Sequence, residues 1–312
     1  MNTQTVEYKA KAFEPRNLAF FFLLAFGLTW IKDGLAALFD LKMPTSITDP
    51  VILFVVFIGI PGAIGPTFAA FVMTAITEGK PGVKNLWKRF WNRNASLKWL
   101  LVALLFYDAI RLTANLIARA LDIQAYPILE LPDPLWSYIP ALVTPFIING
   151  MGEEFGWRGY ALPRFQARWN ALTSSLILGV IWASWHILFF FIPGASLYQR
   201  NFLEWAPWII LSSVIYTWLF NNTKGSVLIA ALFHATANYS MFILPTHASV
   251  WYFMAIMLLA MILIVIVFGT KNLVRQRVEA HSPLRELPAG ETAVENTPQA
   301  LTGTKLQVSD RR

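Results

Sequence analysis

The feature of this sequence that most limits its fold is a series of long apolar segments separated by short polar stretches. A helix needs about 20 predominantly apolar residues to cross the hydrocarbon core of a bilayer. Eight segments approach this length, and they span residues 17–39, 51–77, 98–120, 136–157, 171–192, 205–221, 225–244 and 249–269. The sequence therefore predicts an all-α, polytopic integral membrane protein with about eight transmembrane helices.

Composition excludes the main alternatives to a membrane protein. Only 14% of the residues are charged and 56% are hydrophobic, whereas a soluble domain has about 25% charged residues. Cysteine is absent, which excludes disulfide frameworks, thiolate metal sites and a cysteine nucleophile. The net charge of +7 does not indicate a nucleic-acid partner, because Lys and Arg lie in short loops between apolar runs. We expect the lipid bilayer, and no nucleic acid, to be a partner.

Basic residues occur in every second loop, and the loops between them are acidic or nearly uncharged. The positive-inside rule therefore predicts that both termini are cytoplasmic and that the chain is a multi-pass protein of the cell inner membrane. The longest basic stretch, 80–99, also contains three Trp residues and is expected to lie along the cytoplasmic interface. A role in docking substrate is the alternative for this stretch.

The sequence divides into an N-terminal stretch, a transmembrane domain and a C-terminal tail. Residues 1–16 form a polar, cytoplasmic N-terminus before an uncleaved first span. Residues 17–270 form the transmembrane helical domain. Residues 271–312 become polar beyond about residue 278, rich in Pro, Glu and Thr without any period, and are expected to form a disordered cytoplasmic tail.

The fourth apolar segment carries ionisable residues where they are costly, at about 2.5–3.5 kcal/mol each on translocon scales. Glu153 and Glu154 point about 100° apart on a helix, so we expect them to have different roles. Glu154 and Arg158 are spaced i, i+4 and are predicted to pair, so that Glu154 has a structural role. Glu153 has no such local partner, and a buried, unpaired carboxylate suits a general base or acid. The alternative is that both carboxylates are structural.

A histidine in the fifth segment is predicted to lie as far from the connecting turn as Glu153 does, and therefore at the same depth in the membrane. The two segments should form a helical hairpin that turns near Trp169 and Asn170. Glu153 lies 16 residues before Trp169, and His186 lies 16 residues after Asn170. Equal helical rise places both at about 24 Å from the turn. This coincidence favours a joint catalytic role over a structural histidine.

The seventh segment adds a second pair of polar residues. His234 and Asn238 are spaced i, i+4 and therefore lie on one helix face near the middle of the bilayer. The pair could bridge helices by hydrogen bonds. It also offers two donors that could stabilise an oxyanion.

The first of these motifs resembles one in the CPBP family, the type II CAAX-prenyl-protease and bacteriocin-processing (Abi-like) intramembrane proteases. Glu153, Glu154 and Arg158 match the family's Glu-Glu-x-x-x-Arg motif. The resemblance extends over residues 140–245, where three motifs occur in order on three predicted spans.

The other two motifs complete the resemblance. Trp182 and His186 match an aromatic residue followed by x-x-x-His, and His234 and Asn238 match His-x-x-x-Asn. Phe is the commoner aromatic residue at the position of Trp182, and we expect this departure to bear on packing more than on chemistry.

The resemblance implies an intramembrane endopeptidase that acts on membrane-associated peptides or proteins, among them prenylated or leader peptides. Glu153 and His186 would activate a water molecule, while His234 and Asn238 would stabilise the oxyanion. Glu154 and Arg158 would orient the site.

Metal dependence is left open by the residue types. Glu153, His186 and His234 could hold a zinc ion with one position left for water, although no His-Glu-x-x-His sequence is present. The same residues also make a metal-free, water-activating site, which we favour.

Two other function classes remain alternatives at this point. One is a catalytically inert membrane scaffold or immunity protein that keeps the fold and binds a partner. The other is a proton-coupled transporter with buried Glu and His residues as a relay, although no inverted repeat is evident in the sequence.

Overall fold

The computed structural model describes residues 13–40, 59–91, 96–121, 134, 136, 138–193, 195–246 and 250–275. Within these ranges the chain folds into helices and turns and contains no β-strand, which confirms the all-α prediction. The described residues belong to one structural unit, Met1–Gln276. The predicted disordered tail lies outside the described residues from 276 onward.

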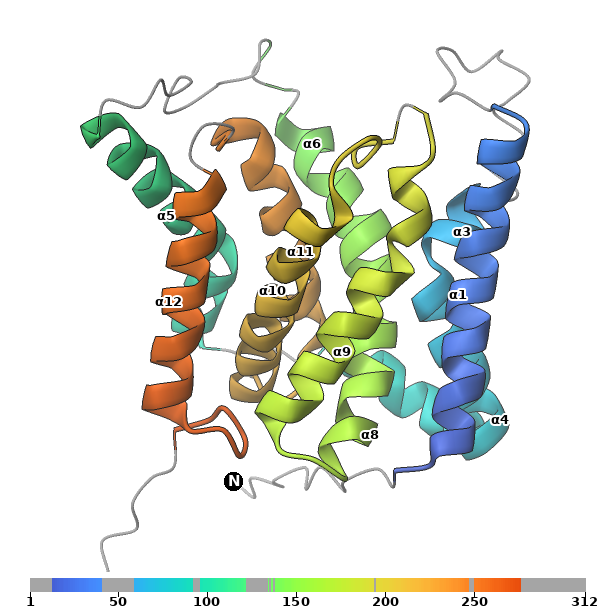
Figure 1. Ribbon diagram of the computed structural model, residues 1–312. Helices are drawn as coiled ribbons and strands as arrows, with labels where there is room; N and C mark the ends of the chain where they lie inside the picture. Colours follow the sequence, from blue (N-terminus) through green and yellow to red (C-terminus); the bar gives the residue numbers. More distant parts are fainter. Residues whose placement is uncertain are drawn as a thin grey trace, which may run out of the picture. The chain divides into compact units, whose positions relative to one another are not determined.

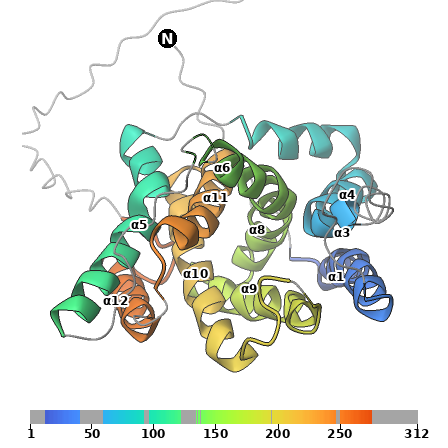
Figure 2. The ribbon, with the colours of Figure 1, turned by 90° about the horizontal axis from the view of Figure 1, so that it is seen from above.

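Within the described ranges, four elements precede the segment that contains the first sequence motif, namely α1 (Pro15–Leu38), α3 (Ile60–Ala63), α4 (Gly65–Lys88) and α5 (Leu97–Ala120). Helix α1 packs along α4, whereas α5 packs against α11 and α12. Figure 2 shows α1 and α4 on one side of the bundle and α5 with α12 on the other. The motif-bearing elements lie between these two groups (Figure 1).

The segment with the two adjacent glutamates is a run of short helical elements instead of one regular helix. In chain order these are α6 (Tyr138–Pro145), the π-helix η3 (Phe146–Met151), α7 (Gly152–Glu154), the π-helix η4 (Phe155–Ala161) and α8 (Leu162–Gln166). We call residues 138–166 the motif segment. Its two π-helical stretches lie immediately before and after the glutamates.

The remaining elements are α9 (Ala171–Trp185), the 3₁₀ turn η5 (Ile187–Phe190), α10 (Phe202–Asn222), α11 (Val227–Ile243) and α12 (Val250–Phe268). Side-chain caps fix where three of the helices begin. Asn170 accepts a bond from the Thr173 amide before α9, and Asn201 and Ser226 cap α10 and α11 in the same way. The short turn at Asn170 confirms the predicted hairpin between the motif segment and α9.

Four helices of the described residues, α1, α5, α10 and α12, are long and apolar enough to cross a membrane by length and composition. Two shorter helices, α9 and α11, are also apolar. These helices agree with six of the predicted segments to within a few residues, except that α9 ends at Trp185 instead of continuing to 192. The second predicted segment lies partly outside the described residues, and the fourth is the irregular motif segment. A multi-pass membrane protein fits this set of helices.

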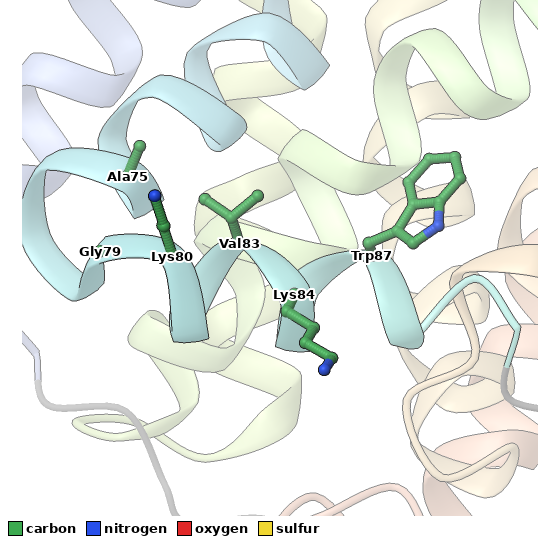
Figure 3. Close-up of a pocket in the computed structure, with 6 residues that line it drawn as sticks. All are labelled: Ala75, Gly79, Lys80, Val83, Lys84 and Trp87. Atoms are coloured by element: carbon green, nitrogen blue, oxygen red, sulfur yellow. The ribbon is translucent and has the colours of Figure 1, made fainter.

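Helix α4 runs well beyond the predicted end of the second segment at residue 77. It is broken at Gly79, whose φ of 65° is accessible to glycine at little cost, and Pro81 follows in the new direction. The break leaves a surface cavity of about 500 Å³ that is lined in part by Lys80, Lys84 and Trp87 (Figure 3). None of the candidate catalytic residues lines this cavity.

Candidate active site

The π-helical turns around Glu153 and Glu154 are held by side chains of neighbouring elements. A π turn shifts the backbone hydrogen-bond register, and irregular backbone inside a membrane needs other partners. The Thr67 hydroxyl donates to the Met151 carbonyl at 2.7 Å just before the glutamates. On the other side, Arg89 Nη1 donates to the Gly159 carbonyl at 2.7 Å.

Two glycines allow the motif segment to pack closely against other helices. A Cβ atom at Gly150 would lie 2.5 Å from the Ala231 carbonyl oxygen of α11. A Cβ atom at Gly156 would lie 2.5 Å from the Pro66 carbonyl oxygen of α4. Because both contacts are to backbone, a side chain at either glycine would move the glutamates relative to their partners.

Glu153 is buried, with 1% of its surface exposed, and both of its oxygens face polar groups. Its Oε2 accepts hydrogen bonds from two indole nitrogens, Trp182 Nε1 at 2.8 Å and Trp157 Nε1 at 3.1 Å. Its Oε1 lies 3.9 Å from His234 Nε2. The expectation that Glu153 has no local partner was therefore wrong, because the residue at i+4, Trp157, has an indole N–H that donates to the carboxylate.

Glu154 contacts the other nitrogen of the same imidazole, Nδ1 of His234. Its Oε1 lies 2.8 Å from His234 Nδ1 and also accepts from Arg158 Nη1 at 3.2 Å, which confirms the predicted i, i+4 pair. An Nδ1–H bond to a carboxylate fixes the orientation of an imidazole and directs Nε2 toward Glu153. The two adjacent glutamates thus face different nitrogens of His234, and their other partners differ, with two indoles at Glu153 and Arg158 at Glu154.

Arg158 is fully buried, and two aromatic rings pack against its guanidinium group. Its Cζ lies 4.4 Å from the ring centroid of Trp182 and 4.3 Å from that of Tyr216. Cation–π contacts in a desolvated site offset part of the cost of burying the charge, and the Glu154 carboxylate offsets more. The guanidinium therefore has a fixed position from which it orients Glu154.

His186 is joined to this cluster through the backbone of Trp182. It is the C-terminal cap of α9, and its Nδ1–H donates to the Trp182 carbonyl at 2.8 Å. The indole of Trp182 bonds to Glu153, so one residue contacts both proposed water-activating groups. The histidine with the direct approach to Glu153 is His234, not His186.

Asn238 lies one turn after His234 on α11 and is half-buried. Among the described residues, no hydrogen bond joins its amide to Glu153, Glu154 or either histidine. The role of Asn238 stays a prediction.

The metal-binding alternative depends on which atoms of Glu153, His186 and His234 are available as ligands. The described residues contain no group of three His, Asp or Glu side chains placed to hold a metal ion. Nδ1 of His186 and Nδ1 of His234 are both engaged in hydrogen bonds, which leaves Nε2 of each ring available, and one Glu153 oxygen accepts from two indole donors. The zinc alternative stays a prediction, and no catalytic step below depends on it.

Residue spacing did not identify every member of the cluster. Trp157 had a signal, because it is spaced i, i+4 from Glu153. The bond from the Trp182 N–H joins residues that are 29 positions apart, so no local spacing marks it. Tyr216, whose ring also packs edge-on against His234 at 5.8 Å, lies in α10 without any local pattern that marks it.

The comparisons with known proteins agree with this geometry. Residues 135–240 match the family model described as type II CAAX prenyl endopeptidase Rce1-like, and this range contains every candidate site residue. A relative named CAAX prenyl protease 2, from Methanococcus maripaludis, is 24% identical over 190 residues, which cover 57% of this chain and 69% of that protein. Three ordered motifs, their convergence on one buried cluster and these two matches lead to one conclusion. Over residues 135–240 the chain is similar to the Rce1-like type II CAAX prenyl endopeptidase (CPBP) family of intramembrane peptidases.

Proposed function

We propose that this protein is an intramembrane endopeptidase in which Glu153 is the general base. The observation that carries the proposal is the 3.9 Å gap between Glu153 Oε1 and His234 Nε2, both buried among apolar and aromatic side chains. A water molecule at an ordinary hydrogen-bond distance of about 2.8 Å can contact both atoms at once. A carboxylate next to such a water is suited to removing its proton.

The reaction then follows from the positions of these groups. Glu153 Oε1 takes a proton from the water, and the water oxygen forms a bond to the scissile carbonyl carbon. The carbonyl oxygen becomes an oxyanion, which the imidazole of His234 and the Asn238 amide stabilise. The proton on Glu153 passes to the amide nitrogen, and the C–N bond breaks. His186 supports the water together with Glu153, and Glu154 and Arg158 orient His234.

The substrates that we propose are membrane-associated peptides or proteins, including prenylated C-terminal tails and leader peptides. The relative's name, CAAX prenyl protease 2, favours the prenylated class. A surface cavity of about 820 Å³ also begins directly after His186, and Ile187, Phe190, Phe191 and Phe202 contribute to its lining. An apolar cavity of this size suits a lipidated or hydrophobic segment.

For the membrane topology, we propose that residues 17–270 form the transmembrane domain, with about eight crossings in a cell inner membrane. Both termini would then be cytoplasmic. The motif segment and α9 form an antiparallel hairpin whose turn, near Asn170, follows the basic residues Arg164 and Arg168. The positive-inside rule places this turn on the cytoplasmic side.

Cleavage assays in proteoliposomes test the proposal. Wild-type protein, Glu153→Gln and Glu204→Gln would be incubated with a farnesylated peptide, the same peptide without the lipid, and a leader-type peptide. Glu204 is an exposed carboxylate in the first turn of α10, so its substitution makes the same chemical change away from the cluster. We expect Glu153→Gln to lower the initial rate by about 10²- to 10⁴-fold and Glu204→Gln to leave it unchanged.

Two further outcomes decide between alternatives. If Glu153→Gln has the thermal stability of the wild type and still cleaves at the wild-type rate, Glu153 is not the base. Loss of wild-type cleavage on adding a strong chelator, with recovery on adding zinc, would establish the metal-dependent alternative.

A further inference from the structure

Glu153 Oε2 accepts two indole N–H bonds from different elements of the fold. One donor, Trp157, belongs to η4 in the motif segment, and the other, Trp182, belongs to α9. We propose that these two tryptophans are positioning residues that restrict the general base to a single oxygen, Oε1. The inference depends on the role proposed above for Glu153 and assigns a function to the indole N–H groups themselves.

The argument begins with the freedom of a carboxylate. Rotation about the terminal bond of a glutamate side chain has broad, roughly two-fold minima, so either oxygen can turn toward a bound water. Two donors at 2.8 and 3.1 Å on the same oxygen remove this freedom. Hydrogen bonds to an ionised acceptor are stronger than neutral ones, and a buried site strengthens them further. Oε1 is thereby held 3.9 Å from His234 Nε2, where the proposed water binds.

Trp182 also contacts the other members of the cluster. Its backbone carbonyl accepts from His186, and its ring covers Arg158 at 4.4 Å. The same ring packs edge-on against His234, with centroids 5.6 Å apart and planes at 72°. A phenylalanine in this position could keep the ring contacts with Arg158 and His234, but it has no N–H to donate. The N–H bond can therefore be tested separately from packing.

The kinetic test compares Trp157→Phe and Trp182→Phe with Trp218→Phe. Trp218 is a buried tryptophan of α10 whose indole nitrogen has no hydrogen-bond partner among the described residues, so it is a matched control. Loss of one bond to a charged group predicts a fall in kcat of about 10- to 100-fold for each cluster variant, with KM changed by less than about twofold. The control should keep the wild-type kcat. Equal effects in all three variants would overturn the proposal.

A second substitution separates the N–H from the shape of the ring. Replacement of Trp182 by β-(3-benzothienyl)alanine keeps a bicyclic aromatic side chain and exchanges the N–H for sulfur. We expect the same fall in kcat as for Trp182→Phe. A wild-type kcat in this variant would show that ring shape, not the hydrogen bond, is what Glu153 requires, and would overturn the proposal.

An NMR measurement tests the contacts without any substrate. Indole N–H signals of the detergent-solubilised protein would be assigned with the three Trp→Phe variants and compared between wild type and Glu153→Gln. The signals of Trp157 and Trp182 should shift, whereas that of Trp218 should not. Unshifted cluster signals would overturn the proposal. Shifted signals in a protein that cleaves no peptide would support the tryptophan–carboxylate contacts and instead contradict the proposed endopeptidase function.

Discussion

Helix α12 and the motif segment differ in hydropathy, in burial and in the regularity of their backbone. Helix α12 has a mean hydropathy of 2.9 over its most apolar window, the highest of the four candidate spans, and the smallest buried share at 17%. The motif segment contains no helix of comparable length, and its glutamates and Arg158 are almost completely buried. The conformation of α12 follows from its own apolar sequence, whereas that of the motif segment depends on contacts with neighbouring elements.

This difference shows where chemistry can be located in such a fold. A regular apolar helix satisfies its backbone internally and needs little from other helices. The motif segment requires Thr67 and Arg89 for its carbonyls and glycines for close packing. These dependences make it sensitive to substitution, and they also hold the carboxylates in defined positions. Substitutions in the two kinds of region test this difference.

The largest effect is expected for Arg158→Gln in the motif segment. It leaves Glu154 buried without its cation, which should lower the free energy of unfolding by about 3–5 kcal/mol. Arg119→Gln on the exposed surface of α5 makes the same change and should be nearly neutral. SDS titration in mixed micelles measures both. The comparison fails if the two variants unfold at the same SDS fraction.

The next effect concerns close packing. Gly156→Ala places a Cβ atom against the Pro66 carbonyl and should destabilise the protein by about 1–3 kcal/mol. Gly27→Ala in α1 meets nothing within 4 Å, and it should be neutral or stabilise the helix by up to about 1 kcal/mol. Thermal melting in detergent distinguishes them. A stable Gly156→Ala protein would mean that α4 and η4 can separate at little cost.

A smaller effect is expected when one backbone contact is removed. Thr67→Val keeps the side-chain shape and leaves the Met151 carbonyl without its hydroxyl donor, at a cost of about 1 kcal/mol. Thr113→Val is the matched control, because the Thr113 hydroxyl bonds only to its own helix at Ala109. If the π turn needs the Thr67 hydroxyl, the cleavage rate should also fall in Thr67→Val and not in Thr113→Val. Unchanged rates in both would show that the turn is held without this bond.

The smallest effect is expected on the surface of α12. Leu259 is 54% exposed, so Leu259→Ala should change the free energy of unfolding by less than about 0.5 kcal/mol and leave the cleavage rate unchanged. Analytical ultracentrifugation of the same samples provides the check. A large loss of stability together with a change in oligomeric state would show that this face contacts another protein and not lipid.

The regular helices could be predicted closely from sequence, because hydropathy and length determine them. The third predicted segment, 98–120, differs by one residue from α5, and the eighth, 249–269, by one residue at each end from α12. The motif segment was predicted to end at residue 157 but remains helical to Gln166. Its π turns depend on contacts with α4 and α11, and no local residue pattern encodes them.

The site could be predicted only where its contacts are local. The i, i+4 spacing predicted the Glu154–Arg158 pair, which is confirmed. The bond from Trp182 to Glu153 joins elements 29 residues apart, and the ring of Tyr216 reaches Arg158 from a third element. Such contacts depend on how helices pack, so they need the three-dimensional arrangement.

The residues that contact the backbone and the charged groups of the motif segment lie partly before it and partly after it in the chain, so they are synthesised at different times. Pro66, Thr67 and Arg89 on and just after α4 are translated before the segment, whereas Trp182 and His234 are translated after it. A nascent motif segment can therefore dock its irregular backbone on α4 as soon as it leaves the ribosome. Its charged groups must wait for α9 and α11 before they are covered. The cluster is consequently complete only after α11 has been translated and has packed against the motif segment.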